Sequence, residues 1–196
     1  MMRVFCLLII LSFSSLLMAA GDPQALVVDS SNKVLEILKA QKTELKKNPE
    51  KIYDVVNQYV LPHFDFEKMS KWVLSRYWAK ASAKEKQDFV NEFRHLLVRT
   101  YAASLLEYTD SKIKYLPLQG DLSSGKVTVR SEIDQAGGFP IPIDYRLHLK
   151  NDAWKVYDVK IDGISLIANY RTTFAKEIRQ SNIRELINRL VEGNKQ

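Results

Sequence analysis

Residues that could carry acid–base or metal chemistry are few and scattered along the chain. None of the three histidines, His63, His95 and His148, has a second histidine or a cysteine three or four positions away. A metal site built on one element needs such spacing, so we expect no metal ion. In a predicted strand, His148 occupies one of the alternate positions that carry polar residues, so its side chain should face solvent.

Two further groupings resemble catalytic motifs. Asp158 and Asp162 lie four residues apart at the end of a predicted strand, so they would share a face and could act as an acid–base pair. Polar strand faces carry such residues routinely, however. Residues 163–167 (Gly-Ile-Ser-Leu-Ile) resemble a nucleophile elbow but lack its second glycine, and Ser165 fits better as a helix N-cap.

Nucleotide-binding signatures are missing from the sequence. Neither a G-x-G-x-x-G nor a Walker A pattern occurs, so the sequence gives no support for nucleotide binding. The chain has 29 Lys and Arg against 23 Asp and Glu, a net charge of +6. No nucleic-acid motif accompanies this charge, so we expect no nucleic acid. Phospholipid headgroups or acidic proteins are the anionic partners to consider, and a plain solvated basic surface explains the charge equally well.

The N-terminus predicts export. Arg3 precedes an apolar run from Val4 to Leu11, and the small residues Ala19 and Ala20 come later, as in a cleaved signal peptide covering residues 1–20. A membrane anchor is the alternative, but the apolar run is too short and serines dilute the segment after it. Cleavage leaves residues 21–196 as a single domain without Cys6, the one cysteine, and we expect that domain in the periplasm.

Hydrophobic periodicity predicts an α+β fold. Helical spacing recurs over residues 23–45, 49–61, 66–77 and 82–108, and again over 165–178 and 183–191. Period-two alternation with short turns predicts strands over 112–118, 127–133, 143–150 and 154–161. The apolar parity of the last strand switches between Val156 and Tyr157, which indicates a bulge or a strand buried on both faces. We therefore expect helices packed on one face of a curved four-stranded antiparallel sheet.

Aromatic residues are the remaining signal, with 9 Tyr, 8 Phe and 3 Trp. Many fall where a helix would face the sheet. An ordinary core accounts for each of them individually. A curved sheet wrapped by helices can also enclose a mostly apolar cavity.

Several stretches, taken in order and spacing, resemble the MlaC family of toluene-tolerance proteins, which bind phospholipids in the periplasm of Gram-negative bacteria. They are Val60-Leu61-Pro62-His63-Phe64, Trp72-Val73-Leu74 leading to Tyr77-Trp78, residues 81–87 through Phe89, Phe93 and Tyr101, and residues 154–159 with 162–166. The resemblance covers essentially the whole chain after residue 20.

The resemblance implies a function. A member of this family would be a soluble periplasmic carrier that shuttles a diacyl phospholipid between outer-membrane and inner-membrane Mla components and so maintains outer-membrane lipid asymmetry. Its partners would be the MlaD component of the inner-membrane ABC transporter and an outer-membrane MlaA-type lipoprotein complex. The resemblance further implies a protein that is not an enzyme and uses no cofactor, with a nuclear-transport-factor-like cone around the acyl tails. It also implies that the turn at Asp162–Leu166 lies near the pocket mouth or a partner surface. The sequence leaves the oligomeric state open, although a shuttle is most simply a monomer.

Such a carrier must shield the acyl chains of its lipid from water. Two acyl chains hold roughly 30 methylenes, and exposing them to water would cost on the order of 24 kcal/mol at about 0.8 kcal/mol each. A deep apolar cavity is therefore required. The residues expected to bind the lipid are Trp72, Val73, Tyr77, Phe89, Phe93, Leu97, Tyr101, Leu105, Val127, Val129, Tyr145, Leu147, Trp154, Val156 and Ile164. The alternatives are an interaction module without a cavity and a small-molecule enzyme on the same fold.

Overall fold

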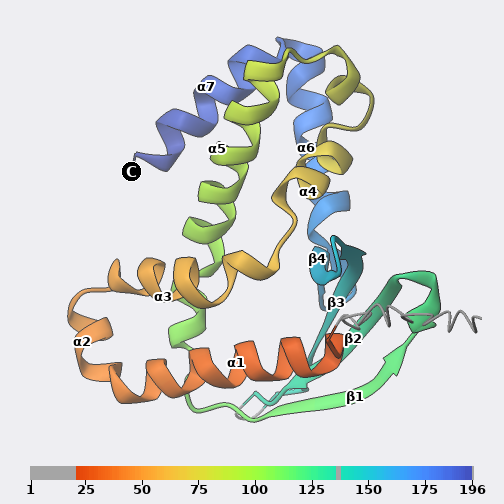
Figure 1. The fold of residues 1–196 in the computed structure, drawn as a ribbon. Helices are drawn as coiled ribbons and strands as arrows, with labels where there is room; N and C mark the ends of the chain where they lie inside the picture. Colours follow the sequence, from red (N-terminus) through yellow and green to blue (C-terminus); the bar gives the residue numbers. More distant parts are fainter. Residues whose placement is uncertain (1–20, 136–137, 196) are drawn as a thin grey trace, which may run out of the picture.

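A computed structural model describes residues 21–135 and 138–195 of the chain (Figure 1). The predicted signal peptide, residues 1–20, lies outside the described residues. No helix within the described ranges is both long enough and apolar enough to cross a membrane. The elements in chain order are α1 (Pro23–Ala40), α2 (Lys42–Lys47), α3 (Lys51–Tyr59), η1 (Leu61–His63), α4 (Phe66–Leu74), η2 (Ser75–Lys80), α5 (Ala83–Tyr101), η3 (Ala103–Leu106), β1 (Ile113–Gln119), η4 (Leu122–Ser124), β2 (Lys126–Ile133), β3 (Ile141–Lys150), β4 (Ala153–Ile161), β5 (Ile164–Ser165), α6 (Leu166–Gln180) and α7 (Ile183–Asn194).

Helix boundaries follow the caps that the sequence carries. Asp65 accepts a hydrogen bond from the backbone N–H of Lys68 and begins α4, and Ser165 caps α6 in the same way. Ser82 and Glu85 form a capping box at the start of α5. Two predicted helices are shorter than expected: the first breaks at Gln41 into α1 and α2, and α5 ends at Tyr101, after which the chain tightens into the 3₁₀ turn η3.

The sheet is an antiparallel meander, confirming the α+β class. Its described strands run in the order β1-β2-β3-β4-β5. The expected count of four strands was wrong by one, because the two-residue strand β5 pairs with the end of β4 through Lys160 and Ser165. The predicted bulge is present: Leu147 pairs with Val156 and Arg146 with Asp158, so Tyr157 has no partner on β3.

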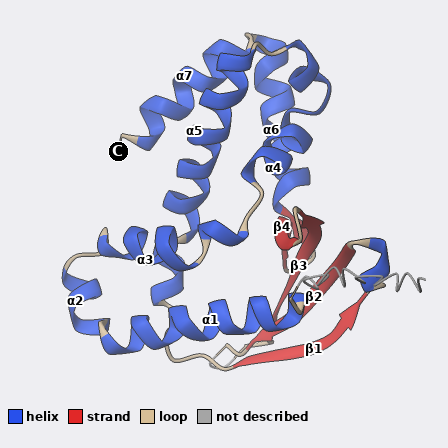
Figure 2. Cartoon of the chain, viewed as in Figure 1, coloured by secondary structure: helices blue, strands red, loops and turns tan. Residues whose placement is uncertain are grey.

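Helices contact both faces of this sheet rather than one. Neighbouring residues on a strand point to opposite faces. Leu147 packs in the same apolar cluster as Val27 of α1. His148 contacts Tyr157 and the Asp65 carboxylate at the start of α4. In Figure 2, α1 lies alongside β1 and β2, whereas α4 and α6 lie next to β4.

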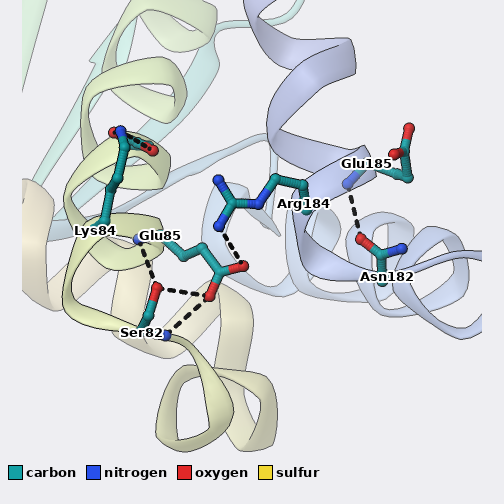
Figure 3. Close-up of polar contacts among 7 residues, drawn as sticks. Ser82, Lys84, Glu85, Asn182, Arg184 and Glu185 are labelled. Carbon is teal, nitrogen blue, oxygen red and sulfur yellow. Dashed lines mark hydrogen bonds and ion pairs between the residues drawn. The ribbon is translucent and has the colours of Figure 1, made fainter.

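Within residues 21–135 and 138–195, apolar side chains divide among three buried clusters. One fills the arm formed by α4, α5, α6 and α7, drawn at the top of Figure 1. A second joins the strands to Val27 of α1, and the third joins α1, α2 and α3 to the end of α5. The arm is further tied by Arg184 of α7, whose guanidinium lies 3.1 Å from the Glu85 carboxylate of the capping box (Figure 3).

The stability of the arm should depend strongly on Phe93, which is fully buried. The centroid of its ring lies 5.3–6.1 Å from the ring centroids of Phe89, Tyr170 and Phe174. Truncating a buried phenylalanine removes transfer free energy and leaves a cavity, so Phe93→Ala should lower the free energy of unfolding by about 3–5 kcal/mol in urea denaturation. The matched control is Phe139→Ala, because Phe139 is 93% exposed and its loss should cost almost nothing. Equal losses in the two variants would contradict this account of the core.

Candidate functional site

An apolar cavity lies between α1 and the face of the sheet that α1 covers. Its volume is about 190 Å³. Its wall comes from α1, the segment around η1, η3 with the turn that follows it, and strands β1 to β4. The lining residues are Leu26, Val27, Ser30, Ser31, Val34, Leu35, Leu38, Val60, His63, Phe64, Leu105, Tyr108, Ile113, Ile133, Ile143, Tyr145 and Val156.

Local sequence explains how these residues meet. The α1 contributors recur three and four positions apart, from Leu26 to Leu38, so they form one stripe of the helix. Ile143 and Tyr145 are two residues apart on β3 and therefore share a sheet face. A helical stripe laid along a strand face gives an elongated apolar space, the shape that an acyl chain needs.

The cavity wall is uncharged. It contains no Asp, Glu, Lys or Arg among its lining residues. Burial, reinforced by nearby Lys155, lowers the pKa of His63, so its ring is neutral at neutral pH. Burial raises the pKa of Tyr145 to about 12, so its phenol stays protonated. Ser30 donates its hydroxyl to the Leu26 carbonyl oxygen at 2.7 Å and is thereby satisfied within its own helix. Such a wall suits methylenes, and it holds no carboxylic acid.

One polar group beside the cavity is unsatisfied. Tyr115 on β1 lies opposite Ser131 of β2, and its buried hydroxyl has no hydrogen-bond partner, although Ser31 of α1 lies near it. Burial raises the pKa of this hydroxyl, so it remains a neutral donor. A buried polar atom without a partner costs stability unless something else supplies the bond.

The structure distributes the residues expected to bind lipid over three places. Leu105, Tyr145 and Val156 line the cavity. Val127, Val129, Leu147 and Trp154 share an apolar cluster with Val156 but are not in the lining. Lipid contact at the cluster positions stays a prediction.

Most of the remaining expected residues lie in the helical arm, away from the cavity lining. Val73, Phe89, Phe93 and Leu97 are buried there, and Tyr77 and Tyr101 pack against them. Trp72 is 41% exposed and lies edge-on to Tyr157, and Ile164 is 63% exposed. Helical periodicity identifies an apolar face but not the element that covers it, which is why α5 residues facing α6 were expected to face the sheet.

Sequence reasoning missed the largest contributor to the cavity, which is α1. Its apolar stripe was recognised as helical through Val27, Val34, Leu35 and Leu38 but was not assigned to a site. The pair Ser30-Ser31 within that stripe was the available signal, because small polar residues leave room beside an otherwise apolar helix face.

The two aspartates considered as an acid–base pair do not form one. Asp158 is fully buried and accepts hydrogen bonds from the Ser165 hydroxyl at 2.7 Å and the Ile167 backbone N–H at 3.2 Å. It therefore holds the N-terminus of α6, where a negative charge is favourable. Asp162 lies beyond the end of β4 in a left-handed turn, with φ of 50°, so the two carboxylates do not share a strand face.

The prediction that His148 faces solvent was wrong. His148 is buried, and its Nε2 lies 3.0 Å from Oδ2 of Asp65. Strand parity placed His148 on the polar face correctly, but the start of α4 covers that face. The same Asp65 oxygen lies 3.0 Å from the Lys150 ammonium. Within the described ranges, no cluster of three or more His, Cys, Asp or Glu side chains is arranged to hold a metal ion.

Comparisons with known proteins agree on one family. The model of the family described as MlaC protein matches residues 28–192. The toluene tolerance protein ttg2D of Pseudomonas putida is 29% identical over 89% of this chain and 81% of its own length. The intermembrane phospholipid transport system binding protein MlaC of Haemophilus influenzae is 25% identical over 91% of this chain and 85% of its own length. A solved structure, the phospholipid-binding protein from Ralstonia solanacearum in complex with a phospholipid, superimposes with a TM-score of 0.82 at 30% identity, over 89% of this chain and 98% of that one.

Removing the unsatisfied hydroxyl should stabilise the lipid-free protein. Tyr115→Phe keeps the ring and deletes the buried orphan donor, so the free energy of unfolding should rise by about 1 kcal/mol in urea denaturation. Tyr53→Phe, at a partly exposed position on α3, serves as the control and should be neutral. A clear loss of stability in Tyr115→Phe would show that the hydroxyl already has a partner in the lipid-free protein.

Acid should destabilise the folded protein through both members of the buried Asp65–His148 pair. Burial lowers the pKa of His148 below its usual 6.5, and although burial alone would raise the pKa of Asp65, its bonds to the Lys68 N–H, Lys150 and His148 lower it overall. Because both folded pKa values lie below the unfolded ones, their contribution to stability is complete above about pH 6.5. It should fall as pH drops through the folded pKa of His148 and then of Asp65.

The measurement is the free energy of unfolding against pH. His148→Gln should flatten the part of the curve just below about pH 6.5. His95→Gln is the control, because the His95 side chain is 52% exposed. A His148→Gln curve that parallels the wild type would contradict the assignment.

Proposed function

Because the chain belongs to the MlaC family, whose model it matches from residue 28 to residue 192, we propose that it is a phospholipid carrier. In this proposal the acyl chains of a diacyl phospholipid occupy the cavity between α1 and the sheet. The uncharged apolar wall of that cavity is the observation that carries the proposal. The related Ralstonia solanacearum protein, solved in complex with a phospholipid, supports the same ligand class.

The cavity must widen to accept its ligand. Its volume of about 190 Å³ lies below the roughly 300–1,000 Å³ typical of pockets for drug-sized molecules, and two acyl chains are larger than such molecules. Val27 of α1 packs in the apolar cluster of the sheet, so opening this contact exposes apolar surface. Acyl methylenes then replace those contacts with others of the same kind. Such an exchange is nearly neutral in free energy, as reversible loading and delivery require.

The cellular role follows the same proposal. The carrier would work in the periplasm after removal of residues 1–20, and it would exchange phospholipid with the MlaD component of an inner-membrane ABC transporter and with an MlaA-type lipoprotein complex of the outer membrane. The net charge is +6 for the full chain and +5 once Arg3 is removed with residues 1–20, and this positive charge favours encounter with anionic headgroups and acidic protein surfaces. An enzymatic role has little support, since Asp158, the buried acid considered for it, is fully engaged in holding α6.

Filling the cavity should abolish lipid binding. Val34 is buried on α1 and lines the cavity, so Val34→Trp places an indole where an acyl chain would lie. Protein purified without detergent is examined by native mass spectrometry, followed by organic extraction. We expect one diacyl phospholipid bound to the wild type and a loss of more than about tenfold in occupancy for Val34→Trp.

The control for this test is Leu122→Trp, which adds the same bulk at a position 54% exposed and outside the cavity lining. It should retain the lipid. Bare wild-type protein, still bare after incubation with phospholipid vesicles, would overturn the carrier proposal. Full occupancy in a folded Val34→Trp variant would place the acyl chains elsewhere.

A further inference from the structure

A second concave site adjoins the apolar cavity. It is a groove of about 480 Å³ between the η1 segment, the start of α4, the middle of α5 and the β3–β4 turn. Its floor includes the apolar residues Leu61, Pro62 and Phe64, and its rim includes the cations Arg94, Lys150 and Lys155. Asp65 also lines the groove, which therefore combines apolar surface with three cations and one acid, unlike the uncharged cavity.

A thin wall separates the groove from the cavity. Within the short stretch 60–64, Val60 and His63 line the cavity, Leu61 and Pro62 line the groove, and Phe64 lines both. The backbone of Phe64 is bridged to Val156 of β4, another residue of the cavity wall. Because Phe64 borders both spaces, the groove and the cavity lie on either side of the same short stretch of chain.

Charge in the groove is not balanced by the protein. The Nε atom of Arg94 is buried without a hydrogen-bond acceptor. Lys155 donates to the neutral carbonyl oxygen of Pro62 at 2.7 Å, which leaves its charge uncompensated.

The nearby acids are already engaged. Asp65 accepts hydrogen bonds from the Lys68 N–H and His148, and it forms an ion pair with Lys150, each at 3.0 Å. Glu67 lies 3.7 Å from Lys150 and is largely exposed. Three cations thus face two acids that Lys150 already contacts, and the groove offers donors to an additional anion.

We propose that this groove binds the phosphate diester of a phospholipid whose acyl chains lie in the adjoining cavity, with Arg94 and Lys155 as the main donors. This inference rests on the proposed carrier function. Guanidinium geometry matches phosphate oxygens, and a lysine ammonium adds a point charge. A free phosphate ion shares this chemistry, so the test must separate the two sources.

The test measures selectivity rather than total binding. Lipid-free protein is incubated with vesicles that contain dioleoylphosphatidylglycerol and dioleoylglycerol, which have the same acyl chains but differ in the phosphate. Bound lipids are extracted and quantified by mass spectrometry. Wild-type protein should favour the phospholipid, and Arg94→Gln should reduce the ratio of phospholipid to diacylglycerol by about tenfold, as expected for loss of a hydrogen bond to a charged group.

Two more variants make the result specific. Arg99→Gln is the matched control, since Arg99 is on the same helix but outside the groove lining, and its ratio should equal that of the wild type. Lys155→Gln removes a cation from the β3–β4 side of the groove and should lower the ratio in the same direction, so the test stands even if Arg94→Gln fails to fold.

The outcomes are distinguishable. Uptake of neither lipid by wild-type protein would overturn the carrier function itself. Uptake of both lipids with a ratio unchanged in Arg94→Gln and Lys155→Gln would leave the carrier function standing and overturn the phosphate groove. Stabilisation of wild-type but not Arg94→Gln protein by inorganic phosphate in a thermal melt, together with an unchanged lipid ratio, would assign the groove to free phosphate and also overturn the headgroup proposal.

Discussion

Apolar packing between α1 and the sheet is the constraint on which the rest of the structure depends. Leu147 and Val27 meet in one apolar cluster at this contact, and the cavity lies in the same layer. In the proposed carrier this surface would open for the acyl chains. The helical arm has a separate core around Phe89 and Phe93.

Buried carboxylates connect that arm to the sheet. Asp158 on β4 holds the N-terminus of α6 through Ser165 and Ile167. Asp65 caps α4 and pairs with His148 on β3. Each acid is satisfied by several donors, so burial does not leave an uncompensated charge. These polar contacts fix the arm on one face of the sheet and leave the other face to α1 and the cavity.

Side-chain chemistry divides the concave surface into two kinds of environment. The cavity beside α1 excludes charge, whereas the groove beyond Phe64 collects it through Arg94 and Lys155. A molecule with two apolar chains and one anionic group is complementary to this pair of sites, because it too has an uncharged part and a charged part. The short stretch around η1 separates the two environments because successive residues of a tight 3₁₀ turn point to different sides.

Local patterns in the sequence determined the elements. The cap at Ser165, the helical spacing, the period-two strands and the parity switch before Tyr157 predicted the α+β meander and the irregularity in its last long strand. These signals act over a few residues, so one sequence suffices to recognise them. The short strand β5 was missed because two residues carry no periodicity. The family followed from the order of several stretches along the whole chain, and the match over residues 28–192 confirmed it.

Only the tertiary structure decided which apolar faces meet. Periodicity showed that α1 and α5 each have an apolar stripe, but it could not show that α1 lines the cavity and Phe93 packs inside the arm. It also could not show that α4 covers His148. Burial depends on residues distant in sequence, because hydrophobic packing is non-directional and any apolar face can bury against any other. The sequence by itself therefore determined the elements and the family, and the packing of distant elements determined the site.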